Sequence, residues 1–220
     1  MVPDAAQPVP NHESSNPLIR TKLHRPPLPS DYVCRERLLD QMDKAMDVPL
    51  TLVSAGAGAG KSVIVAAWLE DRGHPYTWLS LDGADSRLRH FLSYLVAGLE
   101  SLHPDTVQDT AKLLDSPELP PVTVIAAHLT NELDRGTTPR IIVLDDYHLL
   151  NRDSPVHELI RCYLNHTPRN CHLVLVSRED PPLALASLRG GGRINEIRQQ
   201  DLPFSIAETA ELLSRSVQSE

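Results

Sequence analysis

"LTLVSAGAGAGKSVIVAAWLE", residues 50–70, begins with an apolar run that leads through six Gly and Ala residues to a Lys, a Ser and a helical pattern. Phosphate loops have the pattern GxxxxGK[S/T] between a strand and a helix. Gly60, Lys61 and Ser62 match it, and Ala55 stands where the first Gly is usual. Small residues let successive N–H groups turn inward around an anion, and a helix N-terminus adds positive dipole. We therefore expect a phosphate-binding loop.

Two other interpretations of this stretch fit less well. A flexible Gly/Ala linker would have polar flanks rather than an apolar strand and an amphipathic helix. A dinucleotide-binding loop needs GxGxxG, but Gly56 and Gly58 are followed by Lys61 where the third Gly should stand. A nicotinamide or flavin cofactor is therefore not expected.

A second motif, "RIIVLDDYHLL" at residues 140–150, places two carboxylates after an apolar run. Mg²⁺ prefers oxygen ligands and keeps several waters. We assign Asp145 and the Ser62 hydroxyl to the metal, and Asp146 to the orientation of an attacking water, while Lys61 supplies charge to the β- and γ-phosphates. For the two Asp residues alone, an acidic turn at a strand end is the alternative.

The next apolar run, residues 172–177, is followed by Arg178. In a sheet of order 5-1-4-3-2 this strand lies between those of the phosphate loop and the acidic pair, so Arg178 is a candidate contact for the γ-phosphate. A solvated surface arginine is the alternative. His148 is expected to pack or to hydrogen-bond rather than to bind metal, and no two histidines have metal-site spacing.

Strands alternate with helices along the chain, which is typical of an α/β fold. Several strands are almost wholly apolar, as parallel strands are when both sheet faces are covered. The sequence predicts a P-loop NTPase fold: an open, mostly parallel five-stranded sheet of order 5-1-4-3-2 flanked by helices. The expected strands are 50–55, 76–82, 140–146, 171–180 and, more weakly, 195–200, and the expected helices are 34–46, 61–72, those between 82 and 135, 154–166 and 205–217.

Four segments follow from this pattern. Residues 1–17 are expected to be a disordered tail. Residues 18–48 form an extended segment and a helix, residues 49–203 form the NTPase core, and residues 204–220 begin a further, truncated helical domain. Ser205 and Glu208 have the spacing of a capping box at the start of that last helix.

The composition is that of an ordinary globular protein, with 41% apolar and 23% charged residues. The 220 residues include 21 basic and 29 acidic ones, so the net charge is −8 and direct DNA binding is not expected. Three cysteines without CxxC spacing indicate neither a disulfide framework nor a zinc site and favour a reducing cytoplasm. No apolar run reaches the roughly 18 residues of a membrane span.

The motifs also occur in a recognisable order: "TKLHRPPLPSDYVCRERLL", "LTLVSAGAGAGKS", "TWLSLD", "FLSYLVAGL", "IIVLDDYHLL", "LVLVSREDPPLALASLR" and "LPFSIAETAELL". This series, over about residues 18–214, resembles the nucleotide-binding domain of MalT-like regulators, the ATP-dependent LuxR-type transcription factors of the STAND class of signal-transduction ATPases. The family's loop commonly reads APAGxGKT, so Gly56 replaces a Pro and Ser62 a Thr.

The resemblance implies ATP or ADP and Mg²⁺ as cofactors. It places Val33 and Arg35 beside the adenine, makes Arg178 the sensor arginine, and sets Pro203 loosely near a proline that touches the nucleotide in related ATPases. The loop residues that it assigns to the nucleotide are Ala55, Gly56, Ala57, Gly58, Ala59, Gly60, Lys61, Ser62 and Val63.

Such regulators also have a sensor and a DNA-binding domain, and ATP-dependent self-association is expected only in that full-length context. The chain would then be an excised domain or a truncated product. The function expected is a slowly hydrolysing ATP switch. The alternatives are a small-molecule kinase with "SLRGGGR", residues 187–193, as its lid, and a nucleotide-binding interaction module that does not hydrolyse.

Overall fold

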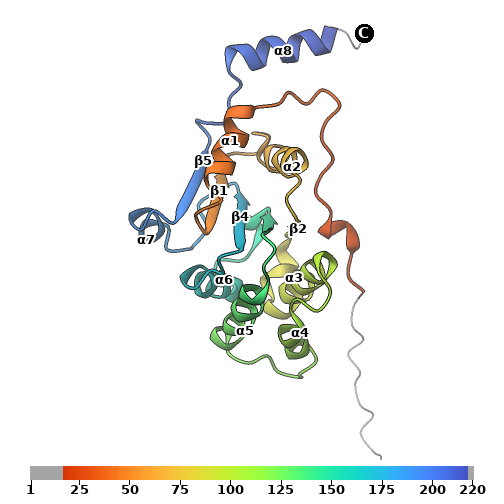
Figure 1. Ribbon diagram of the computed structural model, residues 1–220, viewed down its shortest axis with the longest axis vertical. Coiled ribbons are helices and arrows are strands. Elements are labelled where there is room, and N and C mark those ends of the chain that lie inside the picture. The colour runs from red at the N-terminus through yellow and green to blue at the C-terminus, as the bar shows by residue number, and fades with distance from the viewer. Residues whose placement is uncertain (1–16, 218–220) are drawn as a thin grey trace, which may run out of the picture.

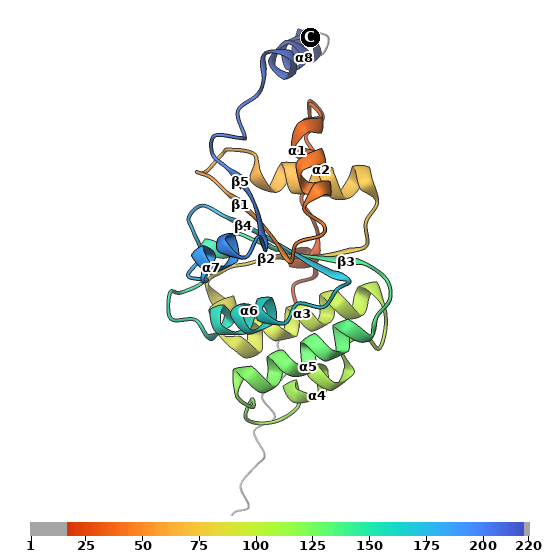
Figure 2. The ribbon, with the colours of Figure 1, turned by 60° about the vertical axis from the view of Figure 1, so that its left-hand side comes forward.

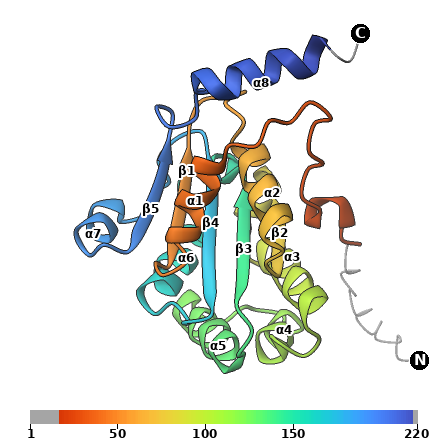
Figure 3. The ribbon, with the colours of Figure 1, turned by 45° about the horizontal axis from the view of Figure 1, so that its top comes forward.

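The computed structural model describes residues 17–217. In this part of the chain five parallel strands form one sheet in the order β2-β3-β4-β1-β5, which is the predicted order counted from the other edge (Figure 3). The sheet that we expected to be mostly parallel is therefore wholly parallel here, and the weakly predicted fifth strand is present. The strands are β1 (Leu50–Ser54), β2 (Tyr76–Ser80), β3 (Arg140–Asp145), β4 (Cys171–Ser177) and β5 (Ile194–Arg198).

Helices cover both faces of the sheet (Figure 2). Side chains alternate between the faces of a strand, so Val53 packs in the core on one side of β1 and Leu52 in the core on the other. The apolar stripe predicted at residues 88–102 forms a helix that packs in the core on the Leu52 side of the sheet. The first face is covered by α1 (Glu36–Lys44) and α2 (Lys61–Arg72), and the second by α3 (Leu88–Leu102), α5 (Val122–Arg135) and α6 (Pro155–Asn165).

The N-terminal segment, predicted to be extended, contains one short 3-10 turn. Lys22 lies in this turn, and its ammonium group is 2.5 Å from Asp85 Oδ2 and 3.1 Å from Asp82 Oδ2, so this ion-pair cluster fixes the segment beside the end of β2. The residues predicted as a disordered tail lie, apart from residue 17, outside the described residues. The short elements are η1 (Arg20–Leu23), η2 (Gly83–Ser86), α4 (Gln108–Leu114), η3 (Tyr147–Leu149) and α7 (Leu185–Gly190).

The last helix, α8 (Ile206–Val217), projects from the body of the molecule (Figure 1). Its predicted capping box is confirmed, because Glu208 N donates to Ser205 Oγ at 3.2 Å and Ser205 N donates to Glu208 Oε2 at 2.7 Å. Ile206 and Leu213 on this helix are exposed. Among residues 17–217 no helix has the length and apolar character needed to cross a membrane.

Candidate nucleotide site

The predicted phosphate loop joins the buried strand β1 to the N-terminus of α2. Its crest, Gly56 to Gly58, is exposed to solvent. Gly58 and Gly60 have φ values of +74° and +79°, in the left-handed region where an L side chain is disfavoured. Gly60 is also the N-cap of α2, so its conformation turns the chain from the loop into the helix. Glycine is therefore favoured at both positions by the backbone conformation.

Lys61 folds back over this loop. Its Nζ donates to Gly56 O at 2.9 Å, and the residue is only 8% exposed. Burial lowers the pKa of Lys61, the charge of Arg178 lowers it further, and the carboxylates of Asp145 and Asp146 oppose both effects. Four charged residues predicted from separate motifs therefore lie within electrostatic reach of one another.

Asp145, the last residue of β3, is 5% exposed and faces the start of α2. Its Oδ1 accepts hydrogen bonds from Ser62 Oγ and from Asp146 N, both at 2.9 Å. Burial is the dominant influence and raises the pKa of this carboxyl to about 6, although the Ser62 hydrogen bond and the Lys61 charge act in the opposite direction. The hydroxyl and carboxylate that we assigned to one metal ion are in direct contact.

Asp146 differs from its neighbour in both backbone and surroundings. Its φ of +56° is in the left-handed region, which Asp tolerates better than most residues but which still costs conformational energy. Its side chain is 44% exposed. The adjacent carboxylates thus occupy two environments, one buried and hydrogen-bonded and the other open to water.

The sequence predicts that His148 packs or hydrogen-bonds rather than binds metal. Its side chain is 10% exposed, its Nδ1 lies 4.0 Å from Asp146 Oδ1, and neither ring nitrogen has a hydrogen-bond partner among residues 17–217. Burial lowers its pKa, with further lowering by Arg178 and Lys61. Of the two roles expected, packing or hydrogen bonding, the structure shows a largely buried side chain without a hydrogen bond among the described residues. The signal that pointed to this residue was its position two residues after Asp146, in the turn that follows β3.

Arg178 follows the last residue of β4, the strand between β1 and β3. Its side chain is exposed, and its charge acts on both Lys61 and His148. The parallel topology explains this position, because the ends of β1, β3 and β4 meet at one edge of the sheet.

On the other side of the loop, Val33 and Arg35 are buried. Arg35 Nη1 donates to Leu202 O at 3.0 Å, and its Nη2 is 3.3 Å from the position that a Cβ on Gly60 would take. The structure therefore brings Arg35 to the phosphate loop and to the residue before Pro203. Val63, in the first turn of α2, is half-buried.

Residues 32–176 match the family described as the AAA ATPase domain, which includes the phosphate loop and the acidic pair. The chain belongs to this family. Membership of the AAA ATPases implies nucleotide and Mg²⁺ binding. The side chains fit such a metal ion: Ser62 and Asp145 offer oxygen ligands, and Mg²⁺ usually keeps water and phosphate oxygens for its remaining positions.

Curated relatives of this AAA ATPase domain include two proteins named HTH-type transcriptional regulator MalT. The one from Yersinia enterocolitica is 34% identical over 191 residues, and the one from Yersinia pestis is 33% identical over 188. The matches cover 87% and 86% of this chain but 21% of each relative, so the chain spans about a fifth of their length. The domain is a MalT-like P-loop NTPase domain.

Solved structures support the fold of this AAA ATPase domain. Cdc6p from Pyrobaculum aerophilum aligns with a TM-score of 0.56 and 15% identity over 92% of this chain and 54% of its own. The Aeropyrum pernix Orc1 protein, solved in complex with DNA, aligns with a TM-score of 0.50 and 15% identity over 87% of this chain and 51% of its own. Together with the strand order, these alignments confirm the P-loop NTPase architecture.

Proposed function

We propose that this domain is an ATP-binding, slowly hydrolysing switch of a MalT-like transcriptional regulator. The observation that supports this most is the meeting of Lys61, Asp145, Asp146 and Arg178 at the carboxyl edge of the sheet. A phosphate-binding lysine, a metal ligand, a solvent-accessible carboxylate and an arginine are the groups that phosphoryl transfer to water requires.

Each residue has a proposed role. Backbone N–H groups of Ala55 to Val63 and the Lys61 ammonium bind the phosphates of ATP or ADP. Ser62 and Asp145 hold Mg²⁺, which supplies charge neutralisation when it is bound. Val33 and Arg35 lie on the adenine side.

The reactive end of the nucleotide is assigned to three side chains. Asp146, the more exposed carboxylate, orients the attacking water. Arg178 contacts the γ-phosphate and so distinguishes ATP from ADP. His148, buried beside Asp146 with two unpartnered nitrogens, is available for a hydrogen bond at the same place. These contacts form only with the triphosphate, so the domain binds ATP and ADP with different affinity, as a switch requires.

Hydrolysis by the chain alone is expected to be slow. By analogy with GTPases that lack an added arginine, the rate should be on the order of 10⁻² to 10⁻⁴ per second. Slow turnover suits a switch, because the ATP-bound state then persists long enough to act.

The relatives' names support the proposal that this domain belongs to a regulator that acts on transcription. We propose that the sensor and DNA-binding functions, and any ATP-dependent self-association, belong to other segments of such a cytoplasmic protein. The net charge of −8 supports the absence of direct DNA binding by this segment. A discrete band shift of an arbitrary duplex at low salt would contradict that assignment.

The contacts of residues 187–193 do not favour the kinase alternative, in which this segment would be the lid. Arg189 donates to Glu196 at 2.9 Å through Nε, and Arg193 donates to Leu164 O, so both arginines of residues 187–193 are already engaged with the domain. An arginine lid must be free to close over a phosphate donor.

Two measurements test the proposal. Mass spectrometry after denaturation should find ADP or ATP in the purified chain. Phosphate release from ATP should be slow, Mg²⁺-dependent and lost in Asp146→Asn, which also separates the switch from a module that does not hydrolyse. Binding of no adenine nucleotide would overturn the proposal.

A further inference from the structure

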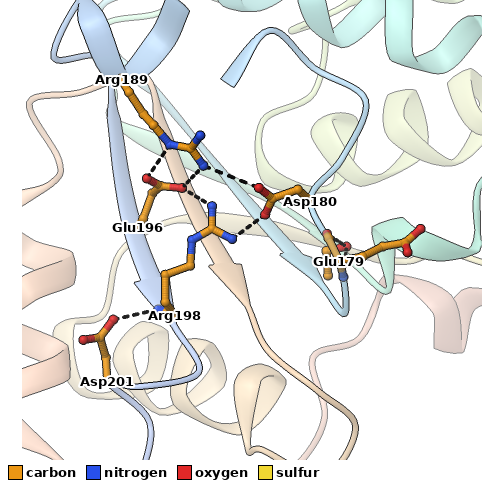
Figure 4. Close-up of polar contacts among 7 residues, drawn as sticks. Glu179, Asp180, Arg189, Glu196, Arg198 and Asp201 are labelled. Atoms are coloured by element: carbon orange, nitrogen blue, oxygen red, sulfur yellow. Dashed lines mark hydrogen bonds and ion pairs between the residues drawn. The ribbon is translucent and has the colours of Figure 1, made fainter. Parts of the chain in front are cut away.

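The loop that follows β4 is fixed at both of its ends. At the first end, Ser177 Oγ donates to Glu179 O at 2.6 Å and accepts from Glu179 N at 3.3 Å. At the second, the Asp180 carboxylate contacts two arginines, Arg189 and Arg198 (Figure 4). Arg178 lies between these anchors, and we therefore expect its backbone position to depend on them.

The two arginines belong to different elements and are joined by a second carboxylate. Arg189, in α7, donates to both oxygens of Glu196 at 2.9 Å, and its Nη2 lies 3.4 Å from Asp180 Oδ2. Arg198, at the end of β5, pairs with Asp180 and with Glu196. Figure 4 shows that the four side chains form a ring of alternating charge, which joins the loop, α7 and β5.

An isolated exposed ion pair contributes little, but this cluster differs from one. It contains a bidentate guanidinium–carboxylate contact, and Arg198 and Glu196 are three-quarters or more buried. Hydrogen bonding to Arg189 is the main reason that the pKa of Glu196 falls to about 2, so this carboxylate stays charged at neutral pH. The two Arg and two acidic residues balance in charge.

The same end of β5 also contacts the phosphate loop. Gln199, the residue after Arg198, accepts a hydrogen bond from Gly56 N at 2.9 Å through its Oε1. Asp201 Oδ2 accepts a hydrogen bond from Arg198 N at 2.7 Å and so fixes the turn of residues 198–201. The end of β5 thus contacts both the Arg178 loop and the loop proposed to bind phosphate.

We infer that Asp180 is a positioning residue that holds Arg178 over the γ-phosphate site, through Arg189 and Arg198. This inference rests on the proposed function, because it concerns the preference for ATP over ADP. Asp180 touches no nucleotide in this arrangement and acts only through the loop. Loss of its charge frees the loop. The phosphate loop keeps its contact with β5, because the hydrogen bonds of Gln199 and Asp201 do not involve Asp180.

The experiment measures the affinities of a non-hydrolysable ATP analogue and of ADP by calorimetry. In Asp180→Ala and the nearly isosteric Asp180→Asn, affinity for the analogue should fall several-fold while affinity for ADP stays the same. Asp180→Glu, which keeps the charge, should restore part of the preference. Asp109→Ala, which removes exposed ion pairs with Lys112 and Arg135 elsewhere on the surface, is the matched control and should change neither affinity.

A double variant decides whether Asp180 acts through Arg178. If it does, Arg178→Ala with Asp180→Ala should have the same ATP-to-ADP preference as Arg178→Ala alone, because interacting residues are not additive. Additive losses, or an equal loss for both nucleotides in Asp180→Ala, would overturn the inference. If Asp180→Ala leaves the preference for ATP over ADP unchanged, only the inference about Asp180 is overturned. If Arg178→Ala leaves this preference unchanged, the proposed γ-phosphate contact is overturned as well.

Discussion

Ser62 Oγ lies 2.9 Å from Asp145 Oδ1, although the two residues are 83 positions apart. Ser62 is in α2, the helix that follows β1, whereas Asp145 ends β3, and β4 lies between these two strands. The contact forms because parallel strands bring their carboxyl ends to one edge of the sheet. The hydroxyl and carboxylate proposed to hold Mg²⁺ are therefore already together in the folded protein, and little rearrangement is needed to bind the ion.

Replacement of Lys61 by Ala should weaken ATP binding on the order of a hundredfold, because hydrogen bonds from its charged ammonium to the phosphates are lost. Calorimetric titration of Mg²⁺ and ATP measures this. Lys112→Ala is the matched control, since Lys112 is exposed and pairs only with Asp109 among the described residues. Equal affinity in Lys61→Ala and the wild type would remove the phosphate-loop assignment.

Variants of the two adjacent aspartates should have different defects. Asp145→Asn should weaken Mg²⁺-dependent nucleotide binding, because a buried ligand oxygen loses its charge. Asp146→Asn should keep that binding and lose turnover, because the exposed carboxylate no longer orients water. Titrations with and without Mg²⁺, paired with phosphate-release assays, distinguish the two. The same defect in both variants would refute the division of roles.

The fold should lose stability as pH falls from about 6.5 to about 4, partly because of His172. This histidine is buried in β4, with Nδ1 2.8 Å from Val48 O and Nε2 2.9 Å from Thr51 Oγ1. Burial lowers its pKa from 6.5 to about 4, so below pH 6.5 the unfolded chain binds a proton that the folded chain does not, and acid favours unfolding. Between pH 7 and pH 5 this costs about 2 kcal/mol.

Chemical denaturation at several pH values measures the effect. The variant His172→Gln, which cannot titrate, should show a correspondingly flatter decline in its free energy of unfolding. Above pH 8 the imidazole is neutral in both states, so the wild type and the variant should there change in parallel. Parallel behaviour below pH 6.5 as well would exclude His172 as a source of the acid sensitivity.

Gly98→Ala should destabilise the domain by about 1–3 kcal/mol, the range for overpacked cores. A Cβ at Gly98, in α3, would lie 2.2 Å from the Oγ1 of Thr77 in β2, so either the Thr77 side chain or the spacing of helix and strand would have to change. Gly190→Ala is the control, because among the described residues nothing lies within 4 Å of the new Cβ and the residue is also helical. Thermal or urea unfolding measures both.

Addition of Thr77→Ala to Gly98→Ala removes the clashing hydroxyl. The double variant should then lose less stability than the sum of the two single changes. A strictly additive result would mean that the close approach of α3 and β2 is not what makes Gly98 necessary.

Local sequence patterns were enough to predict most helices and strands and the fold class. The phosphate loop could be predicted because Gly60, Lys61 and Ser62 act as one short segment, and their spacing does not depend on the rest of the chain. The strand order was also predictable, since apolar strands alternating with helices give a small set of allowed parallel topologies. The capping box of Ser205 and Glu208 is likewise a local pattern.

Other polar contacts become visible only in the folded protein. Gln199 accepts a hydrogen bond from Gly56 N, and Asp180 pairs with Arg198, and no sequence pattern predicts either contact. They depend on crossovers that place β4 between β3 and β1 and put β5 at the edge. The physical reason is that long-range pairing is selected by burial and charge in the assembled fold, after the local preferences of each segment have been satisfied.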